Sequence, residues 1–288
     1  MKLPVEKEKL LDQIVADLSR VENVAAIVLG GSYATGEATE KSDLDIGIYY
    51  FEDRPFAIGS ISAVAEKYAV ARPTVTGFYE WGPWVNGGAW IETARGPVDF
   101  IYKNIDQIER TIAAAQNGEW ENHFEQQPPY GFSSVFFLAE TKHCLPLYDP
   151  AGAIARLKSE VRVYPPKLRE TIVQQSLWWA EFTILHAEIF VRKSDVYNTV
   201  GCLTRAVKYL VTALFAINES YPLGDKRALD ALEKCRRRPE NLRQRIEEIL
   251  CVQKETGHRN VAALKDFFEE TARLTNGLYK PAFDFKKE

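Results

Sequence analysis

The chain has 288 residues, of which 46% are hydrophobic and 26% charged, a composition typical of a globular protein of about two domains. The formal net charge of −4 excludes the strongly basic balance of proteins that bind nucleic acid mainly by electrostatic attraction, so we expect no nucleic-acid partner. An apolar signal core and an uninterrupted apolar run of membrane-spanning length are both missing, so we expect a cytoplasmic protein without a membrane partner.

The cysteines carry no sign of a disulfide framework or a zinc site. The chain has four of them, at Cys144, Cys202, Cys235 and Cys251, and no two have CxxC spacing. We therefore expect reduced, buried thiols.

The N-terminal residues predict a helix, a strand and a glycine turn. Residues 6–20 carry apolar side chains at helical spacing, and residues 24–29 are a branched apolar run of strand length. Gly30-Gly31-Ser32 then ends the strand. Because glycine has no Cβ atom, it adopts positive φ readily and lets a ligand approach the backbone closely.

A second strand is predicted over residues 43–49, and it carries two carboxylates. Side chains alternate along a strand, so Asp43 and Asp45 point to the same face. Neighbouring carboxylates repel each other, and Mg²⁺ is a counter-ion that favours one or two carboxylates together with substrate phosphates. The preceding glycine–serine turn offers backbone N–H groups and a hydroxyl to such phosphates.

This order of Gly-Ser, a spacer of ten residues and Asp-x-Asp within an apolar strand resembles the nucleotidyltransferase superfamily of DNA polymerase beta. That family includes the aminoglycoside nucleotidyltransferases and the minimal nucleotidyltransferases of prokaryotes. The resemblance implies that Gly31 and Ser32 bind a triphosphate and that Asp43 and Asp45 bind metal. The alternative interpretation is that Asp43 is a capping or turn residue and Asp45 belongs to an edge strand.

An aromatic segment follows the next two predicted elements, a helix over residues 56–68 and a strand over residues 74–81. Residues 81–90 contain three tryptophans together with glycine and proline. One interpretation is a wall of the substrate or base pocket, where indole faces stack on a planar or sugar ring. The other is a hairpin loop whose tryptophans fold back onto the core.

Two further strands, over residues 89–95 and 98–102, are predicted on either side of a Gly-Pro turn. In the resembling superfamily, a third carboxylate comes from a strand beside the Asp-x-Asp strand and has an apolar residue on each side. Asp99 matches this description by order and context, and Glu92 on the preceding strand is its rival. The alternative interpretation makes Asp99 a solvent-facing residue at a strand end.

Three helices are predicted before a domain boundary, over residues 104–116, 131–142 and 148–161. Asn104 and Gln107 form a capping box at the start of the first. Two prolines, Pro165 and Pro166, close the region. We therefore predict a nucleotidyltransferase domain over residues 1–163 and a helical bundle domain over residues 164–288.

The second half of the chain reads as helical, and its clearest helix is predicted over residues 199–218. Short connections predict an up-down bundle, so the expected fold class is α+β: an N-terminal mixed sheet flanked by helices, with a C-terminal all-α bundle. The bundle resembles that of aminoglycoside nucleotidyltransferases in architecture, and there a lysine commonly reaches the triphosphate. This resemblance implies Lys208, with Lys226 as second choice, while a plain surface lysine is the alternative for each.

The resemblance implies transfer of AMP from ATP to a hydroxyl of a small-molecule acceptor, with release of pyrophosphate. Two Mg²⁺ ions would lie between the triphosphate and Asp43, Asp45 and Asp99. Asp99 would also act as general base toward the acceptor hydroxyl. The alternatives are nucleotidylylation of a protein or RNA, as in minimal nucleotidyltransferase antitoxins, and a catalytically silent nucleotide-binding module. The sequence does not predict the acceptor, the oligomeric state, or whether ATP or another nucleoside triphosphate is the preferred co-substrate.

Overall fold

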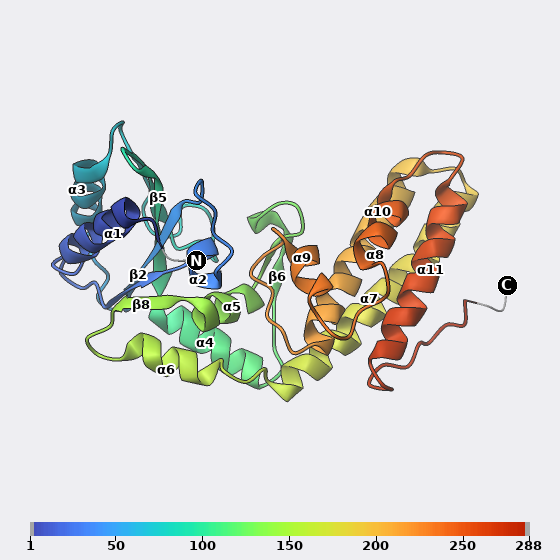
Figure 1. Ribbon diagram of the computed structural model, residues 1–288. Coiled ribbons are helices and arrows are strands. Elements are labelled where there is room, and N and C mark those ends of the chain that lie inside the picture. Colours follow the sequence, from blue (N-terminus) through green and yellow to red (C-terminus); the bar gives the residue numbers. More distant parts are fainter. Residues whose placement is uncertain (1–2, 286–288) are drawn as a thin grey trace. The chain divides into compact units, whose positions relative to one another are not determined.

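The computed structural model describes residues 3–285, which form two compact units (Figure 1). The first unit contains the described residues up to Ala113 together with Glu121–Val163. The second contains Ala114–Trp120 and the described residues from Tyr164 onward. The first unit is built on a sheet and the second is helical, which confirms the predicted α+β class.

A six-stranded mixed sheet is the frame of the first unit. Its strands are β1 (Ala26–Leu29), β2 (Leu44–Tyr50), β3 (Thr74–Val75), β4 (Gly88–Thr93), β5 (Gly96–Asn104) and β8 (Leu145–Tyr148). Their order is β3-β4-β5-β2-β1-β8, in which β2 and β5 pair in parallel and the other neighbours pair antiparallel. A parallel pair cannot be closed by a tight turn, so the chain between β2 and β5 makes an excursion through other elements before it returns.

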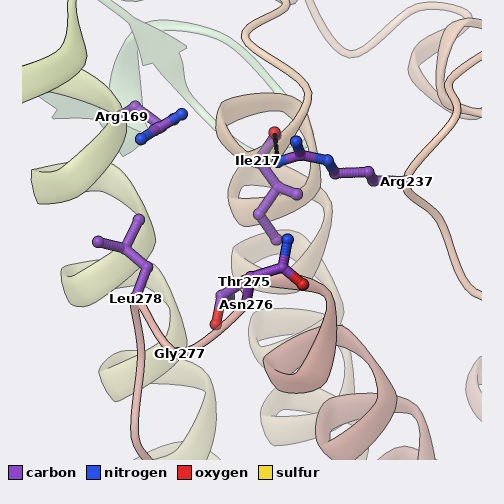
Figure 2. A pocket seen from close by; sticks show the side chains of 7 residues that line it. All are labelled: Arg169, Ile217, Arg237, Thr275, Asn276, Gly277 and Leu278. Carbon is purple, nitrogen blue, oxygen red and sulfur yellow. Dashed lines mark hydrogen bonds between the residues drawn. The ribbon is translucent and has the colours of Figure 1, made fainter.

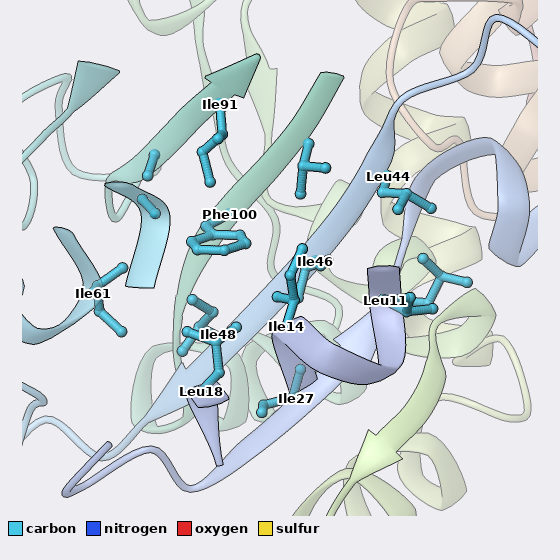
Figure 3. Close-up of a cluster of buried hydrophobic side chains, with 14 of the residues drawn as sticks. Leu11, Ile14, Leu18, Ile27, Leu44, Ile46, Ile48, Ile61, Ile91 and Phe100 are labelled. Atoms are coloured by element: carbon cyan, nitrogen blue, oxygen red, sulfur yellow. The ribbon is translucent and has the colours of Figure 1, made fainter. Parts of the chain in front are cut away.

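The apolar core of this unit lies between one face of the sheet and two helices, α1 (Val5–Leu18) and α3 (Ile58–Tyr68). Alternate residues of the strands point into it, Ile46 and Ile48 from β2 and Phe100 from β5 among them. Figure 3 shows these side chains facing Ile14 of α1 and its neighbours. The residues between them, including Asp45 and Asp99, therefore point to the opposite face.

That opposite face is partly covered by the helix α5 (Val135–His143). Lys103 of β5 forms an ion pair with Glu140 of α5, and its ammonium nitrogen lies 5.1 Å from the centroid of the Phe137 ring. The contact is at the end of β5 remote from Asp99, which is half-buried. The helix α5 therefore packs on the end of β5 that is remote from Asp99.

The remaining elements of the first unit are short: α2 (Gly31–Thr35), α4 (Ile105–Gln116), β6 (Asn122–His123), η1 (Phe124–Gln126), β7 (Phe132–Ser133) and α6 (Ala153–Glu160). Half of the predicted capping box of α4 is present, since the backbone N–H of Gln107 donates to Asn104 Oδ1 at 3.2 Å. In place of the reciprocal bond to Gln107, the backbone N–H of Asn104 donates to Asn86 Oδ1. The last residues of α4, from Ala114 on, count with the second unit.

Three sequence predictions need correction here. The strand predicted over residues 74–81 ends at Val75, and Tyr79 has a φ of 60°, which a strand residue does not adopt. The helix predicted over residues 131–142 begins only at Val135, after β7. Residues 145–148 form the edge strand β8, although Tyr148 was predicted to begin a helix and the three residues before it were assigned to no element. Pro146 argues against a strand at any position other than an edge, so this strand was not predicted.

The second unit consists of α7 (Pro166–Arg192), α8 (Val196–Ile217), α9 (Ala228–Glu233), α10 (Leu242–Leu250) and α11 (Gly257–Leu274). The helices α7 and α8 pack along each other and α11 packs on both (Figure 1). Asp195 caps α8, accepting a hydrogen bond from the backbone N–H of Asn198 at 3.1 Å. Within residues 3–285, α8 alone is long and apolar enough to cross a membrane by length and composition, and half of that window is buried within the protein.

Candidate functional site

The parallel pairing of β2 and β5 brings two of the predicted carboxylates together. Asp45 lies directly opposite Asp99 in the register, with their Cα atoms about 5 Å apart by the usual strand spacing. Paired residues on neighbouring strands point to the same face, and both side chains are half-buried. Asp43 is exposed and precedes β2 by one residue, on the strand end that carries Asp45.

The ionisation of Asp99 shows that the acidic side chains act on one another. Its pKa rises from 3.8 to about 6, first because burial disfavours the charged form and then because of the charges on Asp45, Asp43 and Glu92. Asp43, Asp45 and Glu92 therefore lie close enough to Asp99 for their charges to raise its pKa. Glu92, the rival third carboxylate, is exposed on β4, so of the two only Asp99 lies beside Asp45.

The glycine turn after β1 is packed against Asp45. The backbone N–H of Gly30 donates to the Asp45 carbonyl oxygen at 2.7 Å. Gly31 has a φ of 55°, and a Cβ atom built there would lie 1.7 Å from Asp45 Oδ2. Only glycine fits this position without displacing the carboxylate. Ser32, the next residue of α2, is half-buried, so the predicted phosphate turn and the carboxylate pair are adjacent.

The donor set suits Mg²⁺ completed by phosphate oxygens rather than a metal cage made of protein alone. Within residues 3–285, no group of three or more His, Cys, Asp or Glu side chains is arranged to hold a metal ion by itself. The charge on Asp45 nevertheless contributes, after burial, to the raised pKa of Asp99. Magnesium commonly uses one or two such carboxylates and takes its other ligands from water and substrate.

The three tryptophans of residues 81–90 do not all fold back onto the core, as the hairpin interpretation of this segment would require. Trp84 packs inward, with its ring centroid 5.6 Å from that of Phe132 and 5.4 Å from that of Phe137, as the hairpin interpretation predicted. Trp81 and Trp90 instead stack on each other, with ring centroids 4.4 Å apart and planes 29° apart.

Trp90 lies beside the carboxylates, a position that was not predicted from the sequence. Trp90 is the direct cross-strand partner of Asp99 in the β4–β5 hairpin. A turn at Gly96-Pro97, as predicted from the sequence, would pair Asp99 with Ala94. The hairpin instead turns at Ala94-Arg95 and pairs Thr93 with Gly96, which sets Trp90 opposite Asp99.

Lys208, the predicted triphosphate lysine, lies in α8 of the helical unit among aromatic rings. Its ammonium nitrogen is 5.1 Å from the ring centroid of Tyr209 and 5.9 Å from that of Trp120. Burial lowers its pKa to about 8, an effect that Asp225 opposes. Lys226 is exposed. A role of either lysine at the triphosphate stays a prediction.

A cavity of about 450 Å³ lies in the helical unit, where α8 and α11 end (Figure 2). Its polar side chains are those of Arg169, Arg237, Thr275 and Asn276. Arg169 is paired with Glu219. The guanidinium of Arg237 also donates to the Ile217 carbonyl oxygen at 3.4 Å. None of the site residues predicted from the sequence lines this cavity.

Comparison with known proteins locates a nucleotidyltransferase region in the chain. Residues 9–112 match the family described as nucleotidyltransferase domain. No curated protein matches the chain. Among solved structures, a nucleotidyltransferase-like protein from Exiguobacterium sibiricum 255-15 is similar, with 9% identity, coverage of 94% of this chain and 78% of that chain, and a TM-score of 0.48. The matched region spans the glycine turn and the carboxylates, and residues 9–112 therefore belong to the nucleotidyltransferase superfamily.

Proposed function

We propose that the protein transfers AMP from ATP to a hydroxyl group of a small-molecule acceptor and releases pyrophosphate. One observation carries the proposal: Asp45 and Asp99 occupy facing positions on β2 and β5, with the glycine turn packed against Asp45. A phosphate-binding turn beside paired carboxylates suits transfers that need positioning and charge neutralisation more than covalent help. The match of residues 9–112 to the nucleotidyltransferase family supports the same reaction type.

In this mechanism the acceptor oxygen attacks the α-phosphorus, and the bond from that phosphorus to the oxygen bridging to the β-phosphate breaks. Asp45 and Asp99 would hold Mg²⁺ together with phosphate oxygens, with Asp43 at the same strand end, and the ion when bound neutralises charge on those oxygens. Gly31 and Ser32 would orient the β- and γ-phosphates through their backbone N–H groups. Asp99 would take the proton of the acceptor hydroxyl.

The test measures nucleotide binding and turnover separately on the full chain. Calorimetry with Mg-ATP gives the binding step, and pyrophosphate detection with a panel of hydroxyl-bearing small molecules gives the transfer step. We expect Asp45→Asn to lower pyrophosphate release at least about 100-fold, because it removes a charge where positive ions and phosphates must meet. Asp53→Asn, which alters an aspartate whose side chain is 84% exposed, is the matched control and should keep full activity.

Two results would contradict the proposal. Undiminished turnover in Asp45→Asn would show that the carboxylate pair is not the site. Binding of Mg-ATP without pyrophosphate release on any acceptor would instead favour a silent nucleotide-binding module.

A further inference from the structure

Two stacked tryptophans are left partly open to solvent on the sheet face that carries the carboxylates. Trp81 and Trp90 form a stacked pair, and the Trp81 side chain is nearly half exposed, at 49%. Trp90 is half-buried on β4. An exposed indole retains a large apolar face, and covering it with another ring is favourable.

The order of strands shows which part of a substrate this pair would meet. Across the sheet, Trp90 on β4 is followed by Asp99 on β5, then Asp45 on β2, and then the turn that ends β1. Each step is one strand spacing of roughly 5 Å. The tryptophan pair and the glycine turn therefore lie on opposite sides of the carboxylates.

This order separates the two substrates of the proposed reaction. The phosphates belong beside Gly31, at one side of the carboxylate pair. Asp99 stands between Asp45 and the tryptophans, where the acceptor hydroxyl would give up its proton. The group adjacent to Asp99 on the side away from the phosphates is then the body of the acceptor.

The loop that carries Trp81 is held in place, so the indole is presented in a fixed position. Gln126 donates to the Trp81 carbonyl oxygen, and Gln107 Nε2 donates to the Pro83 carbonyl oxygen at 2.8 Å. The backbone N–H of Tyr79 donates to the Asn86 carbonyl oxygen at 3.1 Å. A tethered aromatic surface loses little conformational freedom on binding, which favours its use as a ligand platform.

We propose that Trp81 and Trp90 form the acceptor-binding platform, which stacks on a ring of the acceptor and directs a hydroxyl of that ring, or next to it, toward Asp99. The proposal rests on the proposed function and adds the class of acceptor: a small molecule with a six-membered ring that has an apolar face. A sugar ring offers such a face through its C–H groups and an aromatic ring through its π system. An acyclic alcohol offers none.

The test is saturation-transfer difference NMR on the full chain with three probes: methyl β-D-glucopyranoside, benzyl alcohol and glycerol. We expect transfer to at least one of the two ring probes and none to glycerol, and the responding ring probe tells a sugar from an aromatic acceptor. Trp81→Ala should reduce the transfer roughly tenfold, because stacking on an indole is lost. Trp81→Phe should restore most of it.

Trp178→Ala is the matched control, since Trp178 is a similarly exposed tryptophan, at 42%, in the helical unit. Its transfer should equal that of the unaltered protein. Indole N–H chemical shifts of the ¹⁵N-labelled unaltered protein give a second measurement that needs no folded variant. The signals of Trp81 and Trp90 should move when the ring probe is added, and that of Trp178 should not.

The proposal is overturned if neither ring probe shows transfer, if Trp81→Ala leaves the transfer unchanged, or if Trp178→Ala removes it equally. Failure of the proposed function gives a different result. The unaltered protein would then release no pyrophosphate, while binding of the ring probe still depended on Trp81. That result would end the role of the tryptophans in acceptor binding but would leave them as a binding site for rings. Pyrophosphate release from a ring acceptor that is unchanged in Trp81→Ala would end the acceptor role and leave nucleotidyl transfer standing.

Discussion

Asp99 keeps its proton to a higher pH in the folded protein than in the unfolded chain. Its pKa is raised from 3.8 to about 6, chiefly by burial and next by the charge on Asp45. Because the native state binds this proton more tightly, the stabilisation that the group provides is complete below pH 3.8. That stabilisation is lost as the pH rises through about 6.

Replacing Asp99 by asparagine should therefore stabilise the metal-free protein at pH 8 and have little effect near pH 4. We expect a gain of about 1 kcal/mol in the free energy of unfolding at pH 8, a value reduced for solvent screening because the carboxyl group is only half-buried. Urea unfolding in EDTA at both pH values measures it, with Asp53→Asn as control. A loss of stability at pH 8 would show that Asp99 has a favourable partner in place of repelling neighbours.

Gly31 is predicted to be indispensable for activity because of its contact with Asp45. Gly31→Ala would place a methyl group 1.7 Å from Asp45 Oδ2, so the carboxylate must move. We expect activity to fall at least about 100-fold and stability to fall by about 1–3 kcal/mol, since alanine is also strained at positive φ. Pyrophosphate release and thermal unfolding measure the two effects.

Gly36→Ala separates these two causes. Gly36 also has a positive φ, of 75°, but a Cβ atom there would meet no atom within 4 Å. The variant should lose about 1 kcal/mol of stability and keep its activity. Equal loss of activity in both glycine variants would mean that backbone strain, and not displacement of Asp45, is responsible.

At the scale of elements, the loop between β3 and β4 depends on one buried asparagine. Asn86 Oδ1 accepts from the backbone N–H of Asn104 at 2.7 Å, and Asn86 Nδ2 donates to Gln107 Oε1 at 2.8 Å. The loop that carries Trp81 is thereby tied to the junction of β5 and α4.

Asn86→Ala should cost about 2–3 kcal/mol of stability, because it leaves the buried N–H of Asn104 without its acceptor. It should also make the Trp81 segment exchange its amide hydrogens faster. Urea unfolding and hydrogen exchange measure these effects, and Asn122→Ala, at an exposed position, is the control. Unchanged exchange around Trp81 would mean that the other hydrogen bonds of the loop suffice.

The elements that could be predicted are those whose signal is local. The alternation of apolar residues around Asp45 and the spacing of the glycine turn identified β1, β2 and the superfamily. The edge strand β8 was missed because Pro146 argues against a strand unless its edge position is known. The neighbours of Asp99 depend on pairing between distant segments, so its stacked tryptophans emerged only from the register.

At the scale of the whole molecule, the division into domains after residue 163 stays a prediction. The two compact units of the structure differ from it in the place of one short segment. Ala114–Trp120 belongs with the helical unit although it precedes Glu121–Val163 of the first unit. Trp120 is responsible for part of this: its Nε1 donates to Gln175 Oε1 at 2.9 Å, and its ring centroid lies 6.0 Å from that of Trp179.

Trp120→Ala should therefore loosen the helical unit and spare the sheet. We expect a loss of about 1–3 kcal/mol in the unfolding of α7 and α8, from the lost hydrogen bond and ring packing. Hydrogen exchange resolved by segment measures it. Trp84→Ala is the matched variant for the other unit, and it should speed exchange in the first unit and leave α7 and α8 unchanged. Faster exchange in the sheet after Trp120→Ala would contradict the assignment of Ala114–Trp120 to the helical unit.

The parallel pairing of β2 with β5 has a consequence for the folding of the first unit. The two strands are separated in sequence by α3, β3 and β4, so no short fragment of the chain can place Asp45 opposite Asp99. Aligning them also sets two negative charges side by side, which opposes the same step. Catalytic competence should thus arrive only with complete folding of the sheet, and no partly folded form of the chain would carry a working set of acidic groups.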